Sequence, residues 1–198
     1  MNTDSIRRIA LRPIGRCSLD QHEALRQLRN HPAIRGAMYS DHIISPEEHA
    51  EWIEGLQGDD RRQVFIVLTS EDDVCGLVSV TAIERAHRRA DWAFYLAPES
   101  RGGLGAALEY TLIQYVFESL GLEKLNCEVL ETNPAVVRMH GKFLFEEEGF
   151  RRSNVIKDGQ RVGVHFLGLT REDWRAGRAE VHARIQEVLS RFEIVLET

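Results

Sequence analysis

A cluster of glycines in the middle of the chain has the spacing of an anion-binding turn. Gly102, Gly103 and Gly105 lie between an apolar segment that stops at Pro98 and a run with helical periodicity that begins at Leu104. Glycines here let the backbone approach a ligand, and the N–H groups of the first helical turn point at it with the positive end of the helix dipole. The turn lacks the Lys-Ser/Thr of a nucleoside-triphosphate loop and an N-terminal dinucleotide unit, which favours another pyrophosphate ligand. Taken alone, a tight strand-helix corner explains the same glycines.

The elements that must position this turn alternate in a regular order. Apolar alternation and β-branched runs predict strands over residues 6–14, 63–69, 75–83, 89–96, 124–130, 150–156 and 162–169. Helical spacing and cap residues predict helices over residues 19–30, 46–56, 104–120 and 134–145. A closing amphipathic helix carries Trp174, Val181, Ile185, Val188, Leu189 and Phe192 on one side. This helix could complete the core, cover the substrate or pair with a second copy in a homodimer.

Length and composition favour a single domain. The chain has 198 residues, of which 43% are hydrophobic, enough for one buried core and short for two. We expect one domain over residues 1–170 and a helical extension of it over 171–198. A formal net charge of -6 argues against general binding to nucleic acid or to an anionic membrane. Three cysteines without a C-x-x-C pair, no apolar stretch of membrane length and no signal-peptide pattern favour a cytoplasmic protein.

Two motifs in a fixed order give the chain a family resemblance. The strand, glycine turn and long helix of residues 91–120 precede a second motif, formed by Asn133, Val136, Met139, His140, Lys142 and Phe145. With the order of strands and helices, these motifs resemble the GNAT superfamily of acetyl-CoA-dependent N-acetyltransferases. The resemblance implies an α+β GNAT fold, with a mixed, mostly antiparallel sheet of about seven strands flanked by helices. It also implies a splay between the fourth and fifth strands, where the acyl channel would lie.

The resemblance implies where acetyl-CoA, the cosubstrate, would bind. Backbone groups near Tyr95 would pair with the pantetheine arm, and the pyrophosphate would lie on the glycine turn with the Arg101 side chain as a charge partner. Asn133 would bind pantetheine or cap the helix that begins at Pro134. The expected cofactor-binding residues are Leu96, Ala97, Arg101, Gly102, Gly103, Leu104, Gly105, Ala106 and Asn133.

The departures from the family pattern concern the reacting end of the site. The turn is one residue short, because Ser100 stands where an Arg or Gln is usual. His140 replaces the usual Tyr that protonates the leaving thiolate, and Leu144 replaces a Gly. Imidazole, with a pKa of about 6.5, is a stronger acid than a phenol of about 10, so His140 could still donate one N–H. A helix histidine without a role, with the acid lost or moved, remains the alternative.

A narrower resemblance lies near the N-terminus, in residues 29–32, 38–45 and 48–53. This block is similar to the N-acetyltransferases of the pseudaminic-acid pathway, which acetylate the 4-amino group of a UDP-linked 4-amino-4,6-dideoxy sugar. It implies that Arg29, His49, Thr81 and Tyr95 bind the acceptor, Arg29 through phosphate and the others through the sugar or a water. Tyr95, His140 and His49 are the expected catalytic residues. Legionaminic-type and other amino-sugar acetyltransferases look similar, so the exact sugar stays open.

The reaction expected is direct attack of the amine in a ternary complex, because no cysteine lies in the motifs as a covalent carrier. No metal is expected, since His42 and His49 lack the i, i+4 spacing and third ligand of a zinc site. Two alternatives are an acetyltransferase of protein N-termini, as for ribosomal proteins, and a GNAT-like module that binds acyl-CoA without turnover.

Overall fold

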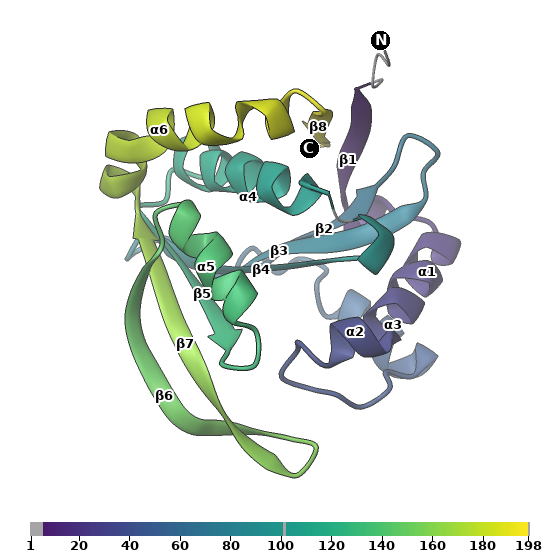
Figure 1. Cartoon of the computed structure of the whole chain (residues 1–198). Helices are drawn as coiled ribbons and strands as arrows, with labels where there is room; N and C mark the ends of the chain where they lie inside the picture. The colour runs from purple at the N-terminus through teal and green to yellow at the C-terminus, as the bar shows by residue number, and fades with distance from the viewer. Residues whose placement is uncertain (1–5, 101, 198) are drawn as a thin grey trace.

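The described residues of the computed structural model, 6–100 and 102–197, form one sheet with helices on both faces (Figure 1). The strands are β1 (Arg7–Pro13), β2 (Gln63–Leu68), β3 (Val74–Glu84), β4 (Arg89–Leu96), β5 (Lys124–Leu130), β6 (Glu146–Lys157), β7 (Gln160–Thr170) and β8 (Phe192–Leu196). The helices are α1 (Leu19–Asn30), α2 (Pro32–Arg35), α3 (Pro46–Glu54), α4 (Leu104–Gln114), α5 (Pro134–Lys142) and α6 (Arg171–Leu189). Among these residues, no helix has both the length and the apolar character needed to cross a membrane.

The sheet is mixed and mostly antiparallel, as the sequence predicts. Its strand order is β6-β7-β5-β4-β3-β2-β1-β8, and only the β4–β5 and β1–β8 pairs are parallel. The β4–β5 ladder is short: Arg89, Ala90 and Asp91 pair with β5, whereas the rest of β4 pairs with β3 alone. Because β5 continues along β7 to its end, the two strands part after Asp91. The predicted splay is confirmed.

Side-chain alternation on the strands sorts the core into two layers. Val78, Val80 and Trp92 face the side covered by α4 and α6, where the larger apolar cluster lies. Leu77 and Tyr95 face the side of α1, with Leu25 of that helix (Figure 1). Burying a leucine of this kind stabilises the fold by about 1.5–3 kcal/mol. Each face of β4 therefore meets a different layer, and Tyr95 and Trp92 lie on opposite sides of the sheet.

The sequence predicts one closing helix over residues 171–198, but the structure is not helical over this whole range. The helix ends at Leu189, and residues from Phe192 onward form β8, which pairs in parallel with β1. Phe192, Ile194 and Leu196 alternate as in a strand, although Leu189, Phe192 and Val195 also continue the helical spacing. The open edge of β1 offers backbone partners to the strand. The sheet consequently has eight strands among the described residues.

The segment after α5 departs from the prediction for a similar local reason. The helix predicted to reach Phe145 ends at Lys142, and Leu144 follows with a φ of +71°. This left-handed conformation suits glycine, which explains why the family pattern has one there. Leu144 packs instead against α6, where a Cβ on Gly177 would lie only 2.6 Å from Leu144 Cδ1. The following acidic residues begin β6 rather than form a turn.

Candidate active site

The glycine turn opens onto the bare amino end of α4. Gly102 and Gly103 have φ values of +99° and +103°, which L-residues with side chains rarely adopt. Within the described residues, Gly103 makes no side-chain capping bond and the first turn holds no acidic residue. The first-turn N–H groups are therefore left for an anion. Arg101, the predicted charge partner, lies outside the described residues.

A cavity of about 550 Å³ runs from this turn into the gap between the two parted strands. Residues 92–96 of β4 and 127–130 of β5 form its walls, and α5 and the α2 segment close it. Of the predicted residues, the cavity is lined by Tyr95, Leu96, Gly102, Gly103, Gly105, Ala106, Asn133 and His140. A pyrophosphate at one end and an elongated thiol arm in the gap fit this shape.

Two predicted cofactor residues do not line the cavity. The Ala97 N–H donates to Cys75 O at 2.8 Å, and its carbonyl accepts from Ser100 N, so both of its backbone groups are engaged. Leu104 places its side chain in the core and stands at the first position of α4, where it offers a backbone N–H. Their predicted contacts to acetyl-CoA stay predictions.

His140 is buried and held by a carboxylate from another helix. Its Nδ1 lies 2.7 Å from Oε1 of Glu109, on α4. The Glu109 side chain is fully buried, and burial raises its pKa while the hydrogen bond to His140 lowers it. Trp92 and Phe145 flank the imidazole with ring centroids 5.4 Å away. His140 is therefore not a half-exposed histidine, as the alternative would have it, and its role as the acid stays a prediction.

Sequence reasoning missed Glu109, although it left a signal. Glu109 is the acid inside the most apolar helix, three, four and seven residues before Leu112, Ile113 and Val116. All three are fully buried, so helical spacing alone places this carboxylate in the core stripe. A charged residue in that stripe needs a partner.

Cys127 lines the cavity but lacks the features of a nucleophile. Burial is the main cause that raises the pKa of its thiol, so the sulfur stays protonated at neutral pH. The Glu109 charge next to it also disfavours a thiolate, because it raises the pKa of the thiol further. This supports direct attack by the amine rather than an acyl-cysteine intermediate.

Arg29, on α1, and Arg35, on α2, lie near enough for their guanidinium charges to interact, and neither residue lines the cavity. Arg29 donates to the Ser40 carbonyl and hydroxyl at 3.1 and 3.0 Å, and Arg35 donates to Asp41 O at 2.6 Å. Nη1 of Arg29 and Nε of Arg35 are buried without a hydrogen-bond partner among the described residues. Burial, and secondarily the Arg35 charge, lower the pKa of Arg29, which Tyr95 raises. Sequence reasoning found Arg29 through its resemblance and missed Arg35.

Tyr95 stands between this pair and the gap. Burial raises the pKa of its hydroxyl, and the nearby Arg29 lowers it. The phenol therefore remains protonated at neutral pH and serves as a hydrogen-bond donor rather than as a base.

The loop that joins α2 to α3, residues 36–45, covers the cavity and is held by hydrogen bonds from two sides. Its residue Tyr39 donates a hydrogen bond to Glu128 of β5. Lys157, at the tip of the β6–β7 hairpin, donates to Arg35 O at 3.1 Å and to Met38 O at 2.7 Å. The long hairpin thus reaches back across more than a hundred residues of sequence to the α2 segment (Figure 1).

The structure does not bring Arg29, His49 or Thr81 to the cavity wall. His49 is buried on α3 beside Trp52, with ring centroids 5.3 Å apart, and burial lowers its pKa. Thr81 pairs with Asp91, four residues along β4 from Tyr95, which is about 13 Å. Their roles at the acceptor stay predictions.

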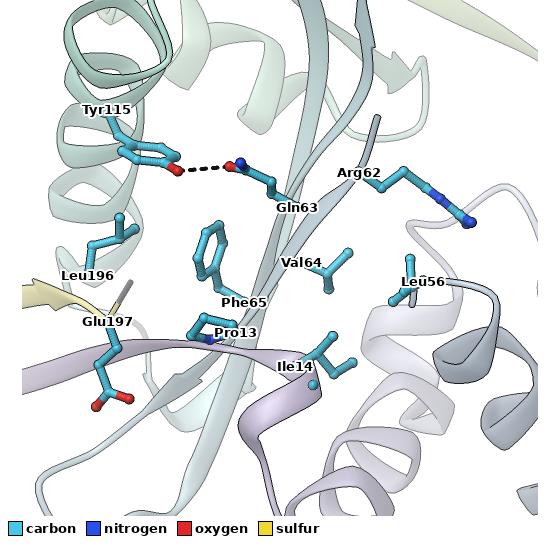
Figure 2. A pocket seen from close by; sticks show the side chains of 11 residues that line it. Pro13, Ile14, Leu56, Arg62, Gln63, Val64, Phe65, Tyr115, Leu196 and Glu197 are labelled. Carbon is cyan, nitrogen blue, oxygen red and sulfur yellow. Dashed lines mark hydrogen bonds between the residues drawn. The ribbon is translucent and has the colours of Figure 1, made fainter. Parts of the chain in front are cut away.

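A second cavity, of about 370 Å³, lies at the other half of the sheet (Figure 2). There the Tyr115 hydroxyl donates to Gln63 Oε1 at 2.8 Å, and the Arg62 side chain extends away from the other lining residues. Arg62 and Glu197 are already engaged, with Asp59 and Arg12. The polar side chains that line it, Arg62, Gln63, Tyr115 and Glu197, each have a partner within the protein.

No group of three or more His, Cys, Asp or Glu side chains within residues 6–100 and 102–197 is arranged to hold a metal ion. The prediction that no metal takes part stays a prediction.

Comparison with known proteins agrees with this geometry. Residues 8–146 match the model of the acetyltransferase (GNAT) domain. The spermidine N(1)-acetyltransferase of Vibrio cholerae is 28% identical over 126 residues, 63% of this chain and 73% of that protein. Acetyltransferase PseH of Campylobacter jejuni is 28% identical over 112 residues, 57% and 68% of the two chains.

A solved structure shares the fold. The spermidine N-acetyltransferase of V. cholerae in complex with CoA and spermine superposes with a TM-score of 0.77 over 84% of this chain and 98% of that one, at 23% identity. The domain match spans most of the sheet, the glycine turn and α5. The chain belongs to the GNAT family and is an acetyl-CoA-dependent N-acetyltransferase.

Proposed function

We propose that the enzyme transfers acetyl to the 4-amino group of a UDP-linked 4-amino-4,6-dideoxy-N-acetyl hexose. The observation that carries this proposal is the pair formed by Arg29 and Arg35, each with a buried nitrogen that lacks a partner. The two arginines lie outside the cavity wall, but Arg29 interacts with Tyr95, which lines the cavity, and this placement suits an acceptor that carries negative charge. The similarity to acetyltransferase PseH also supports it.

The electrostatics of the pair explain the preference. Two neighbouring cations with unsatisfied N–H groups repel each other, and a buried donor without a partner costs about 1–3 kcal/mol. A diphosphate would accept from both guanidinium groups and neutralise them. A polyamine acceptor would add a third positive charge, and Glu128 nearby is already bonded to Tyr39.

The cosubstrate would occupy the other end of the cavity. Its pyrophosphate would lie on the amides of residues 102–106, and its pantetheine arm would lie along Leu96 and Asn133. The amine then attacks the thioester carbonyl directly, with both substrates bound.

Two proton transfers accompany the reaction, one from the amine and one to the leaving thiolate. The amine nitrogen loses a proton to water as the C–N bond forms, while the thiolate sulfur takes a proton from Nε2 of His140 as the C–S bond breaks. Tyr95, which stays protonated, donates a hydrogen bond to the acceptor or to that water. His49 and Thr81 would act on the acceptor outside the cavity wall.

The test compares CoA release with four acceptors: the UDP-linked 4-amino sugar, the same sugar without UDP, spermidine, and a peptide panel. We expect turnover with the UDP-linked amine alone. Arg29→Gln and Arg35→Gln should each raise KM for this acceptor about 10- to 100-fold, as expected for loss of a charged hydrogen bond. Arg26→Gln is the matched control on α1, because Arg26 is engaged by Glu23. Turnover with spermidine or peptides alone would overturn the proposal.

A further inference from the structure

We infer that Glu109 is a positioning residue that fixes His140 as the acid for the leaving thiolate. The inference rests on the proposed role of His140 and adds a group that the family motifs do not include. It accounts for a carboxylate that lies in the apolar core of α4.

The contact between the two side chains sets the direction of the imidazole. Nδ1 of His140 is 2.7 Å from Oε1 of Glu109, and both side chains are at least 95% buried. Since Nδ1 is engaged, Nε2 is the ring nitrogen that can serve a group in the cavity, which His140 lines. The rings of Trp92 and Phe145 restrict how the imidazole turns.

Among the described residues, Glu109 and His140 have only each other as a charged partner. Within the described residues, Glu109 Oε2 is buried without a hydrogen bond, so the carboxylate depends on His140. The other titratable group beside the pair is the thiol of Cys127 on β5, which stays neutral. Aromatic and aliphatic side chains supply the remaining contacts. The hydrogen bond between the two side chains is therefore what fixes the orientation of the imidazole.

The pair acts as one acid. It holds one proton between Oε1 and Nδ1 and a second proton on Nε2. Whether the first proton is bonded to Oε1 or to Nδ1, the proton on Nε2 stays in place. When the C–S bond breaks, the proton on Nε2 passes to sulfur, and the pair is left as a carboxylate bonded to a neutral imidazole. The proton released by the amine to water restores it. The net change is an amine and acetyl-CoA to an amide and CoA thiol, with no other reactant.

A purely structural ion pair would predict a different response. Removing the charge would then lower the melting temperature and leave the chemistry of His140 unchanged. A positioning role predicts a change in the protonation of His140 in the folded protein. Glu109→Gln keeps the shape and an acceptor oxygen but removes the charge, and Glu109→Met removes both charge and hydrogen bond.

The experiment combines ring ¹⁵N NMR of histidine-labelled protein with pH profiles of kcat. His140 is assigned by its loss from the spectrum of His140→Gln. We expect the ¹⁵N ring signals of His140 to shift in Glu109→Gln, because the charged partner of Nδ1 is lost. The kcat should fall about 10- to 100-fold, part of what a positioned acid contributes, with KM for acetyl-CoA unchanged. In Glu109→Met, the ring signal should also lose its single tautomer.

The control is Glu118→Gln, which lies near the far end of the same helical segment and meets Arg178 at the surface. It should leave the spectrum and pH profile as in the unmodified enzyme. Unchanged ring signals of His140 in folded Glu109→Gln and Glu109→Met would overturn the inference. The NMR readout needs no acceptor, so a failure of the sugar-nucleotide assignment shows as missing turnover and leaves this result intact.

Discussion

Asn126 of β5 donates its side-chain amide to Asp91 Oδ1 of β4 across 3.0 Å, on the last backbone rung that joins these strands. Beyond this rung the strands part and the cavity begins. The bond therefore marks the point at which β4 and β5 separate, and it links the two walls of the cavity.

Replacing Asn126 by Asp puts two carboxylates at this junction. We expect the free energy of unfolding to fall by about 1–3 kcal/mol, because a donor is lost and like charges face each other. The Kd for acetyl-CoA should rise about fivefold or more as the walls lose their fixed spacing. Calorimetric titration with CoA and thermal unfolding measure both, and Asn126→Leu separates loss of the bond from added charge. Unchanged CoA binding in both variants would contradict this role.

Gly102 tests the glycine turn directly. A Cβ at Gly102 meets nothing within 4 Å, so Gly102→Ala causes no clash within the protein. It has two effects: the new residue must adopt a φ of +99°, and its methyl group keeps the ligand away from the backbone of the turn. We expect a loss of about 1 kcal/mol in stability and a rise of about tenfold in Kd for CoA.

The matched control is Gly121→Ala, after the helical segment, where φ is +68° and the Cβ also meets open space. It should cost similar stability and leave CoA binding unchanged. Equal effects of both variants on Kd would show that the turn does not contact the cosubstrate.

The strands around the site were predictable because their signals are local. Apolar alternation and β-branched runs gave the bounds of β4 and β5, and the Asp158-Gly159 turn marked the β6–β7 hairpin. β8 was not predictable from its own residues, since it forms only because β1 offers an open edge almost the whole length of the chain away. Its apolar spacing suits a helix equally well.

The residues of the site divide in the same way, into those that belong to local sequence motifs and those that the fold brings together. The turn, Asn133 and His140 belong to contiguous motifs, so sequence placed them at one cavity. The partner of His140 comes from α4, thirty-one residues earlier, and Arg35 lies near Arg29 only because α2 folds beside α1. Such contacts between elements need coordinates, although an acid in an apolar helical stripe could have been noticed.

Lys157 controls the acceptor side through the loop over the cavity. Its ammonium binds Arg35 O and Met38 O, so Lys157→Met leaves two carbonyls without their donor and frees the hairpin tip. We expect stability to fall by about 1–3 kcal/mol and KM for the acceptor to rise several-fold, with CoA binding unchanged. Lys142→Met, at an exposed site, is the control. A larger effect on CoA than on the acceptor would contradict this role.

The docking of β8 should depend on pH through Glu197. Arg12 donates to its carboxylate at 2.8 Å, and this hydrogen bond lowers the pKa of Glu197 in the folded protein. A lowered folded pKa means that the stabilisation is present above the ordinary carboxyl pKa of about 4.3 and is lost as pH falls through the folded value. Glu197→Gln should therefore cost about 1 kcal/mol or less at pH 7 and nothing at the lowest pH at which the protein folds. Denaturant unfolding at pH 7 and below 4 measures the difference, with Glu193→Gln on the same strand as control. A deficit that stays constant with pH would show that the carboxylate charge of Glu197 does not hold β8.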